Sequence, residues 1–271
     1  MKTGHELVRT RGGSVAVRSL SEGEVMHPGV GPRVEAEQLY VRQSRLVERL
    51  AATTDRALVV FDVGLGAGSN ALAAWAAAEQ AAAPARLRLV SFERDLGALA
   101  LALAHAADFG ISPMGVTAAR AVLATGHHET ARTSWRLAHG DVLEALRSEP
   151  EKADIVFWDP FSPRANPELW TVAAFAAIHR AAGPRCTLFT YSASTAVRVA
   201  LLLAGWTVGV GEPIGEKAAT TAAAIASQDL AEPLGPTWLR RLSLPDVPLP
   251  KDAPLDAASR IGRLPQFAAG S

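Results

Sequence analysis

The chain has 271 residues, with 27 lysines and arginines against 27 aspartates and glutamates, and 49% of its residues are hydrophobic. This length and composition predict one large or two small domains with a buried core, and they exclude wholesale disorder. The net charge of zero gives no overall basic excess for binding nucleic acid. A phosphate-binding surface would therefore need an uneven distribution of charge.

Cysteine, histidine and apolar residues restrict the class of protein further. Cys186 is the single cysteine, which excludes an internal disulfide and a cysteine-based zinc site. The seven histidines show no paired ligand spacing, so we expect no metal. The first residues lack a signal-peptide pattern, and no apolar run reaches 18 residues. We therefore expect a soluble cytoplasmic protein that does not associate with membranes.

Three regions differ in pattern along the chain. Residues 1–55 form an N-terminal cap or extension, in which apolar positions predict one helix over residues 34–50. Residues 56–228 alternate between short apolar segments and Ala- and Leu-rich segments. Residues 229–271 hold seven of the 17 prolines, so we expect an irregular tail on the surface.

The middle region predicts the fold class. Expected strands cover residues 58–63, 87–92, 135–138, 155–158, 186–191 and 206–210. Expected helices cover residues 70–83, 96–108, 167–182 and 195–204. Near-continuous apolar strands separated by helices are typical of a mostly parallel, doubly wound α/β sheet of the Rossmann-like kind. Residues 220–225 could add a last, antiparallel strand, and residues 112–134 an additional helix and loop.

A glycine-rich loop directly follows the first of these strands. Its glycines occupy alternate positions: Gly64, Gly66 and Gly68. Such glycines let the backbone approach a ligand, and the helix that begins near Asn70 offers free N–H groups. A dinucleotide fingerprint would place its third glycine at Ser69. The observed spacing, with Asp62 two residues before the first glycine, resembles the first motif of class I S-adenosylmethionine-dependent methyltransferases, in which the acid helps to shape the pocket.

Two acidic residues stand where later strands are expected to end. Glu93 follows the second strand, where a carboxylate can accept hydrogen bonds from both ribose hydroxyls in either ligand class. Asp141 follows the third strand, where methyltransferases of this class often hold the adenine amino group. In a purely structural alternative, both residues are turn or helix-cap residues. Acids at successive strand ends, together with the glycines, favour a ligand site.

Asp159 follows the fourth strand and begins a loop that extends to Trp170. At this edge of the sheet, a carboxylate beside a methyl donor could hold an amine with its lone pair facing the methyl group. Phe161 or Trp170 could stack on a planar base. Alternatively, Asp159 begins a turn and Trp170 packs in the core.

This loop carries a resemblance to a known family. It reads D-P-F-S-P-x-x-N-P-x-L-W and is similar to the signature D-G-F-[AS]-P-x-x-N-P-x-[LM]-W of the tRNA 5-aminomethyl-2-thiouridine methyltransferases. These form one half of bifunctional wobble-uridine enzymes and also occur alone. Residues 64–70 resemble the family's G-F-G-T-G-x-N, and residues 34–41 resemble its L-E-E-x-x-Y-V. Matching stretches cover roughly residues 20–215.

The resemblance implies transfer of a methyl group from S-adenosylmethionine to the exocyclic amine of 5-aminomethyluridine at position 34 of tRNA. It implies that Asp159 is the catalytic residue and that Glu35 and Tyr40 lie near the cofactor or close the site. It also implies a separate flavin oxidase as a partner. Pro160 replaces the family's usual glycine, and Ala218 and the residues after it replace further basic residues.

Six arginines are candidates for contacting tRNA: Arg42, Arg45, Arg164, Arg198, Arg240 and Arg241. Taken singly, each is better explained as an isolated solvated charge. Other functions also stay open at this point. The chain could methylate a small amine or another nucleobase, or it could bind the cofactor without catalysis as the partner of a separate oxidase. A nicotinamide dehydrogenase fits the glycine spacing less well.

Overall fold

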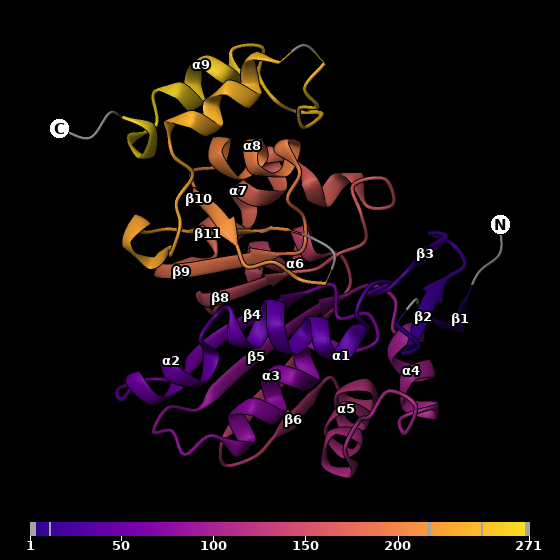
Figure 1. The fold of residues 1–271 in the computed structure, drawn as a ribbon. Coiled ribbons are helices and arrows are strands. Elements are labelled where there is room, and N and C mark those ends of the chain that lie inside the picture. Colours follow the sequence, from indigo (N-terminus) through magenta and orange to yellow (C-terminus); the bar gives the residue numbers. More distant parts are fainter. Residues whose placement is uncertain (1–3, 11, 216–217, 245, 269–271) are drawn as a thin grey trace.

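The computed structural model describes residues 4–10, 12–215, 218–244 and 246–268. Its centre is an eight-stranded sheet with the strand order β10-β11-β9-β8-β4-β5-β7-β6 (Figure 1). The strands of this sheet are β4 Leu58–Val63, β5 Leu87–Glu93, β6 His127–Glu129, β7 Thr133–His139, β8 Ala153–Trp158, β9 Ala182–Thr190, β10 Thr207–Gly211 and β11 Thr220–Ala224. All the strands expected from the sequence are present.

The five central strands are parallel, which confirms the α/β fold class. From β4 the chain adds β5 and β7 on one side, and it then crosses to add β8 and β9 on the other. The strand order therefore reverses between β4 and β8, where open α/β sheets form a crevice for ligands. The segment 220–225 is β11, which is antiparallel to both β9 and β10 as expected.

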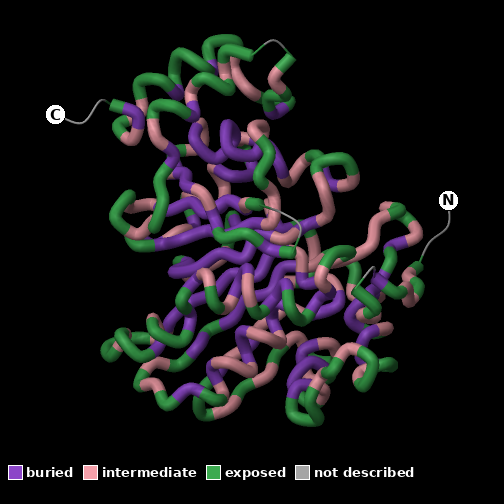
Figure 2. The backbone as a smooth tube through the Cα atoms, in the orientation of Figure 1, coloured by how far each residue is buried: buried purple, intermediate pink, exposed green. Residues whose placement is uncertain are grey.

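Helices cover both faces of the sheet because the inner strands are apolar on both sides (Figures 1 and 2). Alternate side chains of β4 enter different cores, with Phe61 on one face and Val60 on the other. The first core packs against α6 Val142–Ser148, α7 Val172–Arg180 and α8 Thr195–Leu203. The second packs against α3 Ser69–Gln80, α4 Gly97–Ala104 and α5 Pro113–Thr125. No helix within the described ranges is long and apolar enough to cross a membrane.

The N-terminal region differs from the expectation of one helix. It contains a small antiparallel sheet of β1 His5–Arg9, β2 Val15–Ser19 and β3 Glu24–Val25, which the sequence analysis did not anticipate. Residues 34–50 do not form one continuous helix. They are divided among α1 Pro32–Glu35, the π-helix η1 Ala36–Arg42 and α2 Leu46–Ala52, with residues 43–45 in a turn before α2. The break occurs at Arg45, whose backbone is left-handed with φ 55°.

In two other segments the observed elements differ in detail from the expected ones. Residues 112–134 form α5 and the edge strand β6, which pairs antiparallel with β7. The expected helix over residues 167–182 is divided into the 3-10 turn η2 Pro167–Trp170 and α7. Thr171 separates them because its extended backbone ends η2 and its hydroxyl caps Ala174 N–H.

The proline-rich tail is less irregular than expected. Its described residues form η3 Ser227–Asp229, η4 Pro236–Ser243, α9 Ala257–Gly262 and η5 Pro265–Phe267. Trp238, Ile261 and Phe267 are buried in the first core, and Trp238 stacks on Phe267 with ring centroids 6.2 Å apart. The tail thus completes the outer layer over α8.

A fully buried carboxyl group lies in the centre of the sheet. Asp62 Oδ2 accepts a hydrogen bond from Ser91 Oγ at 2.8 Å, and Ser91 Oγ accepts one from Trp135 Nε1 at 3.0 Å. Oδ1 of Asp62 has no hydrogen-bond partner among the described residues. The pKa of Asp62 is raised to about 7, mainly by burial. The hydrogen bond from Ser91 has the opposite effect and lowers this pKa.

The Asp62→Asn variant should therefore be more stable than the native chain at pH 8 by about 4 kcal/mol and nearly equal to it at pH 4. Between these pH values the folded native chain holds a proton that the unfolded chain releases, so the native free energy of unfolding falls as pH rises. Urea unfolding at both pH values measures the difference.

Asp154→Asn is the matched control, since Asp154 is also a buried aspartate of the sheet. It pairs with Arg56 through two bonds of 2.6 and 2.7 Å, so its substitution should destabilise the protein by about 1–3 kcal/mol. Destabilisation by Asp62→Asn at pH 8 would contradict the account of Asp62.

Candidate functional site

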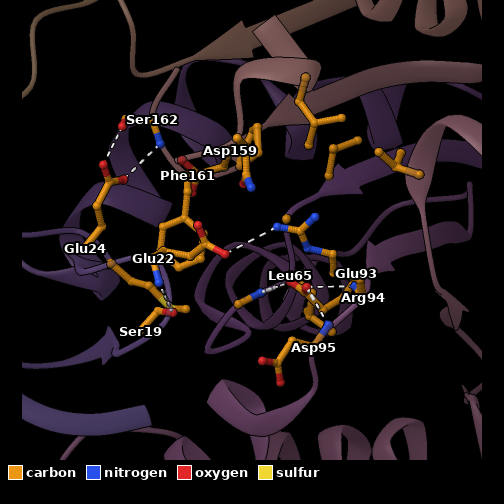
Figure 3. A pocket seen from close by; sticks show the side chains of 18 of the residues that line it. Ser19, Glu22, Glu24, Leu65, Glu93, Arg94, Asp95, Asp159, Phe161 and Ser162 are labelled. Atoms are coloured by element: carbon orange, nitrogen blue, oxygen red, sulfur yellow. Dashed lines mark hydrogen bonds and ion pairs between the residues drawn. The ribbon is translucent and has the colours of Figure 1, made fainter. Parts of the chain in front are cut away.

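A cavity of about 510 Å³ opens at the carboxyl edge of the parallel strands, within the size range of small-molecule sites (Figure 3). One side is formed by the segments that follow β4, β5, β7 and β8. The N-terminal sheet and the residues after it form the other side. Of the residues predicted for the site, the cavity wall includes Gly64, Gly66, Glu93, Asp141, Asp159, Phe161 and Glu35.

Gly64 directly follows β4, at the strand crossover, which is the point where the strand order reverses between β4 and β8. Its φ of +88° and its surroundings both require glycine, because a Cβ atom there would lie 2.7 Å from the Asp159 carbonyl oxygen. The Asp159 N–H also donates to Val63 O at 2.9 Å, so the ends of β4 and β8 are held together. Gly68, which caps α3, does not line the cavity, and Asp62 and Asn70 lie behind the wall.

Glu93 and Asp141 are both on the wall and both have structural partners. Glu93 accepts backbone hydrogen bonds from Gly66, Arg94 and Asp95, which fixes its carboxylate beside the glycine loop. Asp141 caps α6 through Oδ1, and its Oδ2 receives no hydrogen bond from the residues that the structure describes. Each carboxylate oxygen can accept two hydrogen bonds, so both side chains retain capacity for a ligand.

Asp159 is surrounded by polar side chains from four parts of the chain. Asn70 Nδ2 donates to its Oδ2 at 2.6 Å, and the buried Tyr40 hydroxyl lies beside the same carboxylate. His27 Nε2 is 3.6 Å from Asp159 Oδ2, and His27 Nδ1 is 3.7 Å from Glu35 Oε2. Tyr40 and Asn70 therefore support Asp159 from behind the wall, while His27 and Glu35 face the cavity with it.

The pKa of Asp159 is raised to about 6, mainly by burial and also by the nearby Glu35, whereas His27, Asn70 and Tyr40 favour the ionised form. Burial and the Asp159 carboxylate raise the pKa of Tyr40, so Tyr40 is neutral at physiological pH. The same two causes raise the pKa of Tyr191, whose hydroxyl donates to Pro160 O at 3.2 Å. Asp159 is thus a carboxylate at neutral pH, close to neutral hydrogen-bond donors.

The two aromatic residues of the loop have different positions. Phe161 lines the cavity, where it can contact a planar ligand. Trp170 is only 4% exposed and is absent from the wall, so a stacking role is not supported. Its Nε1 donates to Phe161 O at 2.8 Å, and its ring contacts Tyr191 edge-on with centroids 5.7 Å apart. Trp170 therefore holds the loop that carries Phe161.

The N-terminal sheet is joined to this loop by polar contacts, which Figure 3 shows from the cavity. Glu24 accepts hydrogen bonds from Ser162 Oγ at 2.5 Å, Ser162 N at 3.0 Å and Arg164 Nη2 at 3.0 Å. Glu22 pairs with Arg94 at 3.4 Å, and Arg94 also lies 3.6 Å from Glu168. Sequence reasoning missed Glu22, Glu24 and Arg94 because no local pattern reports contacts between residues 70–140 positions apart.

The cavity wall is strongly acidic. Eight carboxyl side chains line it: Glu22, Glu24, Glu35, Glu93, Asp95, Asp141, Asp159 and Glu168. Within the described part of the chain, the basic residues on this wall are Arg94, His5 and His27. A cationic ligand therefore fits this cavity better than an anionic one.

The six arginines proposed for tRNA do not form one surface at the cavity. Arg198 is buried and donates to Thr220 O and Thr221 Oγ1, so its proposed contact with tRNA is wrong. Arg42 pairs with Glu212, and the exposed Arg164 pairs with Glu24. Arg45, Arg240 and Arg241 are exposed. The residues that replace the family's further basic residues begin at Ala218, which is exposed. Glu216 and Lys217, which precede it, lie outside the described residues.

S-adenosylmethionine fits this set of groups. Its sulfonium is cationic and suits the acidic wall. Glu93 can accept hydrogen bonds from its ribose hydroxyls, and Asp141 can accept one from its adenine amino group. The glycine loop lets the ligand approach the backbone of the wall closely. No group of three or more metal-ligating side chains is found within the described residues.

Comparisons with known proteins agree with this chemistry. A family model described as S-adenosyl-L-methionine-dependent methyltransferase matches residues 117–226. The chain is 34% identical over 192 residues to the tRNA 5-methylaminomethyl-2-thiouridine biosynthesis bifunctional protein MnmC of Pseudomonas paraeruginosa, covering 68% of this chain and 29% of that protein. It is 35% identical over 203 residues to the MnmC protein of Chromohalobacter salexigens, covering 68% and 28%. The chain thus spans less than a third of the length of these relatives.

A solved structure matches over nearly the whole chain. The crystal structure of MnmC2 from Aquifex aeolicus is 25% identical, with a TM-score of 0.75, and the match covers 96% of this chain and 84% of that one. The chain belongs to the S-adenosyl-L-methionine-dependent methyltransferases, in the family that includes MnmC2 and the matching region of the MnmC proteins.

Proposed function

We propose that this methyltransferase methylates the exocyclic amine of 5-aminomethyluridine, or of its 2-thio form, at position 34 of tRNA. The names of the MnmC relatives and the motif from Asp159 to Trp170 support this substrate. The observation that carries the proposal is the position of Asp159. A buried, ionisable carboxylate at the strand crossover faces the acidic cavity in which the cofactor fits.

Asp159 holds the acceptor amine by accepting its N–H hydrogen bonds. Above pH 6 the carboxylate is ionised, and it binds an amine hydrogen more strongly than a neutral acceptor would. Asn70 fixes the carboxylate from behind through its hydrogen bond of 2.6 Å, and the Tyr40 ring packs behind the wall, so the amine is oriented rather than merely attracted. When bound, S-adenosylmethionine supplies an electrophilic methyl group on its sulfonium.

The other predicted residues divide into ligand contacts and supports. Glu93 accepts hydrogen bonds from the ribose hydroxyls of the cofactor, and Asp141 accepts one from its adenine amino group. Phe161 contacts the uracil base of the substrate. Gly64 and Gly66 let the backbone approach the cofactor, while Glu35 contributes negative charge at the amine. Asp62, Gly68, Asn70, Tyr40 and Trp170 act from behind the wall. Arg164 orders the loop through Glu24.

We further propose that the cap 1–55, the core 56–228 and the tail 229–271 act as one unit, since side chains of all three pack in the shared cores. Action on tRNA implies a cytoplasmic location, and formation of the aminomethyl group implies a separate enzyme, for which a flavin oxidase is the candidate.

A small amine is a second candidate acceptor, because the eight carboxylates on the wall would also attract a free polyamine. Salt separates the two acceptors. KM for tRNA should rise steeply between 50 and 200 mM salt as counterions are released, whereas KM for a small amine should change little.

The experiment that tests the function is transfer of labelled methyl from S-adenosylmethionine to tRNA that carries unmethylated 5-aminomethyluridine, with spermidine as the small-amine acceptor. Label in the wobble nucleoside supports the proposal. Label in spermidine alone, or in neither acceptor despite cofactor binding, would reject it.

Asp159→Asn keeps the size of the side chain but removes its charge, so kcat/KM should fall by about 10²-fold or more. Cofactor binding, measured by calorimetry, should change little. Asp108→Asn, at an exposed carboxylate outside the cavity, is the control. Native turnover by Asp159→Asn would refute the role.

For the native enzyme, kcat/KM should fall as pH drops below about 6, where Asp159 takes up a proton.

Glu24→Gln should raise KM for the tRNA acceptor roughly tenfold with a smaller change in kcat, because it weakens charge-assisted bonds to Ser162 and Arg164. The loop would then spend less time in the binding conformation. Glu6→Gln is the matched control, since Glu6 lies in the same small sheet and pairs with Arg18 instead. Equal KM values for both variants would show that the contact does not order the acceptor site.

A further inference from the structure

The acceptor amine must lose a proton before it can react. A primary alkyl amine is mostly protonated at neutral pH, and a protonated amine has no lone pair to donate. Asp159 attracts the ammonium form, and the acidic wall favours that form too. The residues proposed so far therefore bind the acceptor in its unreactive state, and a group that accepts its proton is needed.

We propose that His27 is the proton acceptor for the substrate amine, an inference that rests on the function proposed above. His27 lines the cavity, and its Nε2 lies 3.6 Å from the Asp159 oxygen that would bind the amine. An amine hydrogen-bonded to Asp159 is thus within reach of the imidazole ring. Asp159 itself is less suited, because on accepting the proton it would lose the charge that holds the amine.

The step is a simple proton transfer. One N–H bond of the ammonium breaks, its electron pair stays on the amine nitrogen as the lone pair, and the proton binds to the lone pair of His27 Nε2. The imidazolium then lies between two carboxylates, with Glu35 Oε2 3.7 Å from Nδ1 and Asp159 on the opposite side. Asp62, beneath the glycine loop, adds a third nearby carboxyl group, and the hydroxyls of Tyr40 and Tyr191 lie around Asp159. This surrounding stabilises the charged ring.

The backbone at His27 gives an independent argument. His27 has φ 52°, a left-handed conformation that is uncommon outside glycine and often marks a functional site. Met26, the residue before it, is bonded to the small sheet through Met26 N to Val17 O at 2.8 Å. The following Pro28 and Gly29 are exposed, so the proton has a short path to solvent after each turnover.

His27→Asn is the informative variant, because asparagine tolerates the left-handed backbone and cannot accept the proton at this pH. At pH 7 its kcat/KM for 5-aminomethyluridine tRNA should fall about 10²-fold. Between pH 6.5 and 8.5 its rate should rise about tenfold per pH unit as the free amine becomes available, while the native rate levels off. Cofactor affinity by calorimetry should stay within twofold. His105→Asn, at an exposed histidine outside the cavity, should behave as the native enzyme.

A second readout does not depend on turnover. With S-adenosylhomocysteine bound, an anticodon stem-loop carrying 5-aminomethyluridine should shift the ¹⁵N signals of the His27 ring to those of imidazolium at pH 7.5. The inference fails if these signals do not move, or if His27→Asn has a native pH profile or a uniformly lowered one. A native enzyme that transfers no methyl to this tRNA at any pH would instead reject the proposed function and this inference together.

Discussion

The structure depends on the close approach of two parallel strands at the crossover of the sheet. β4 and β8 end side by side, and Gly64 leaves no room for a side chain against the Asp159 carbonyl. The same contact puts the glycine loop and the Asp159 carboxylate on one cavity. In a methyltransferase the donor and the acceptor must be held within contact distance, and open α/β sheets bind ligands at such a crossover.

Burying carboxyl groups at this point has a cost that the surrounding residues reduce. Asp159 is stabilised by Asn70, Tyr40 and His27, which come from three different segments. Asp62, one layer deeper, has only the hydroxyl of Ser91 as a described hydrogen-bond donor. With the other carboxyl groups on the wall, Asp159 gives the cavity a negative potential that suits the cationic sulfonium of the cofactor.

The N-terminal sheet has a role that its small size does not suggest. Through Glu22 and Glu24 it contacts both Arg94 and the Asp159–Trp170 loop, and His27, just after it, lies beside the Asp159 carboxylate. These contacts pair Arg94 and Arg164 with carboxylates, so the two arginines are less available to contact phosphate. Local ion pairs of the same kind occur elsewhere on the surface, as between Arg42 and Glu212.

Local sequence patterns predicted the strands of the main sheet other than β6, its mostly parallel order and the residues at the strand ends. Glycine spacing and apolar runs are local patterns, and parallel topology forces such strand ends to one edge. Tertiary structure alone decided which residues share the cavity. It placed Trp170 and Asn70 behind the wall, buried Arg198, packed the tail into the core and brought His27 and Glu24 to the loop of Asp159. Those outcomes depend on contacts between distant segments, for which a single sequence contains no periodic signal.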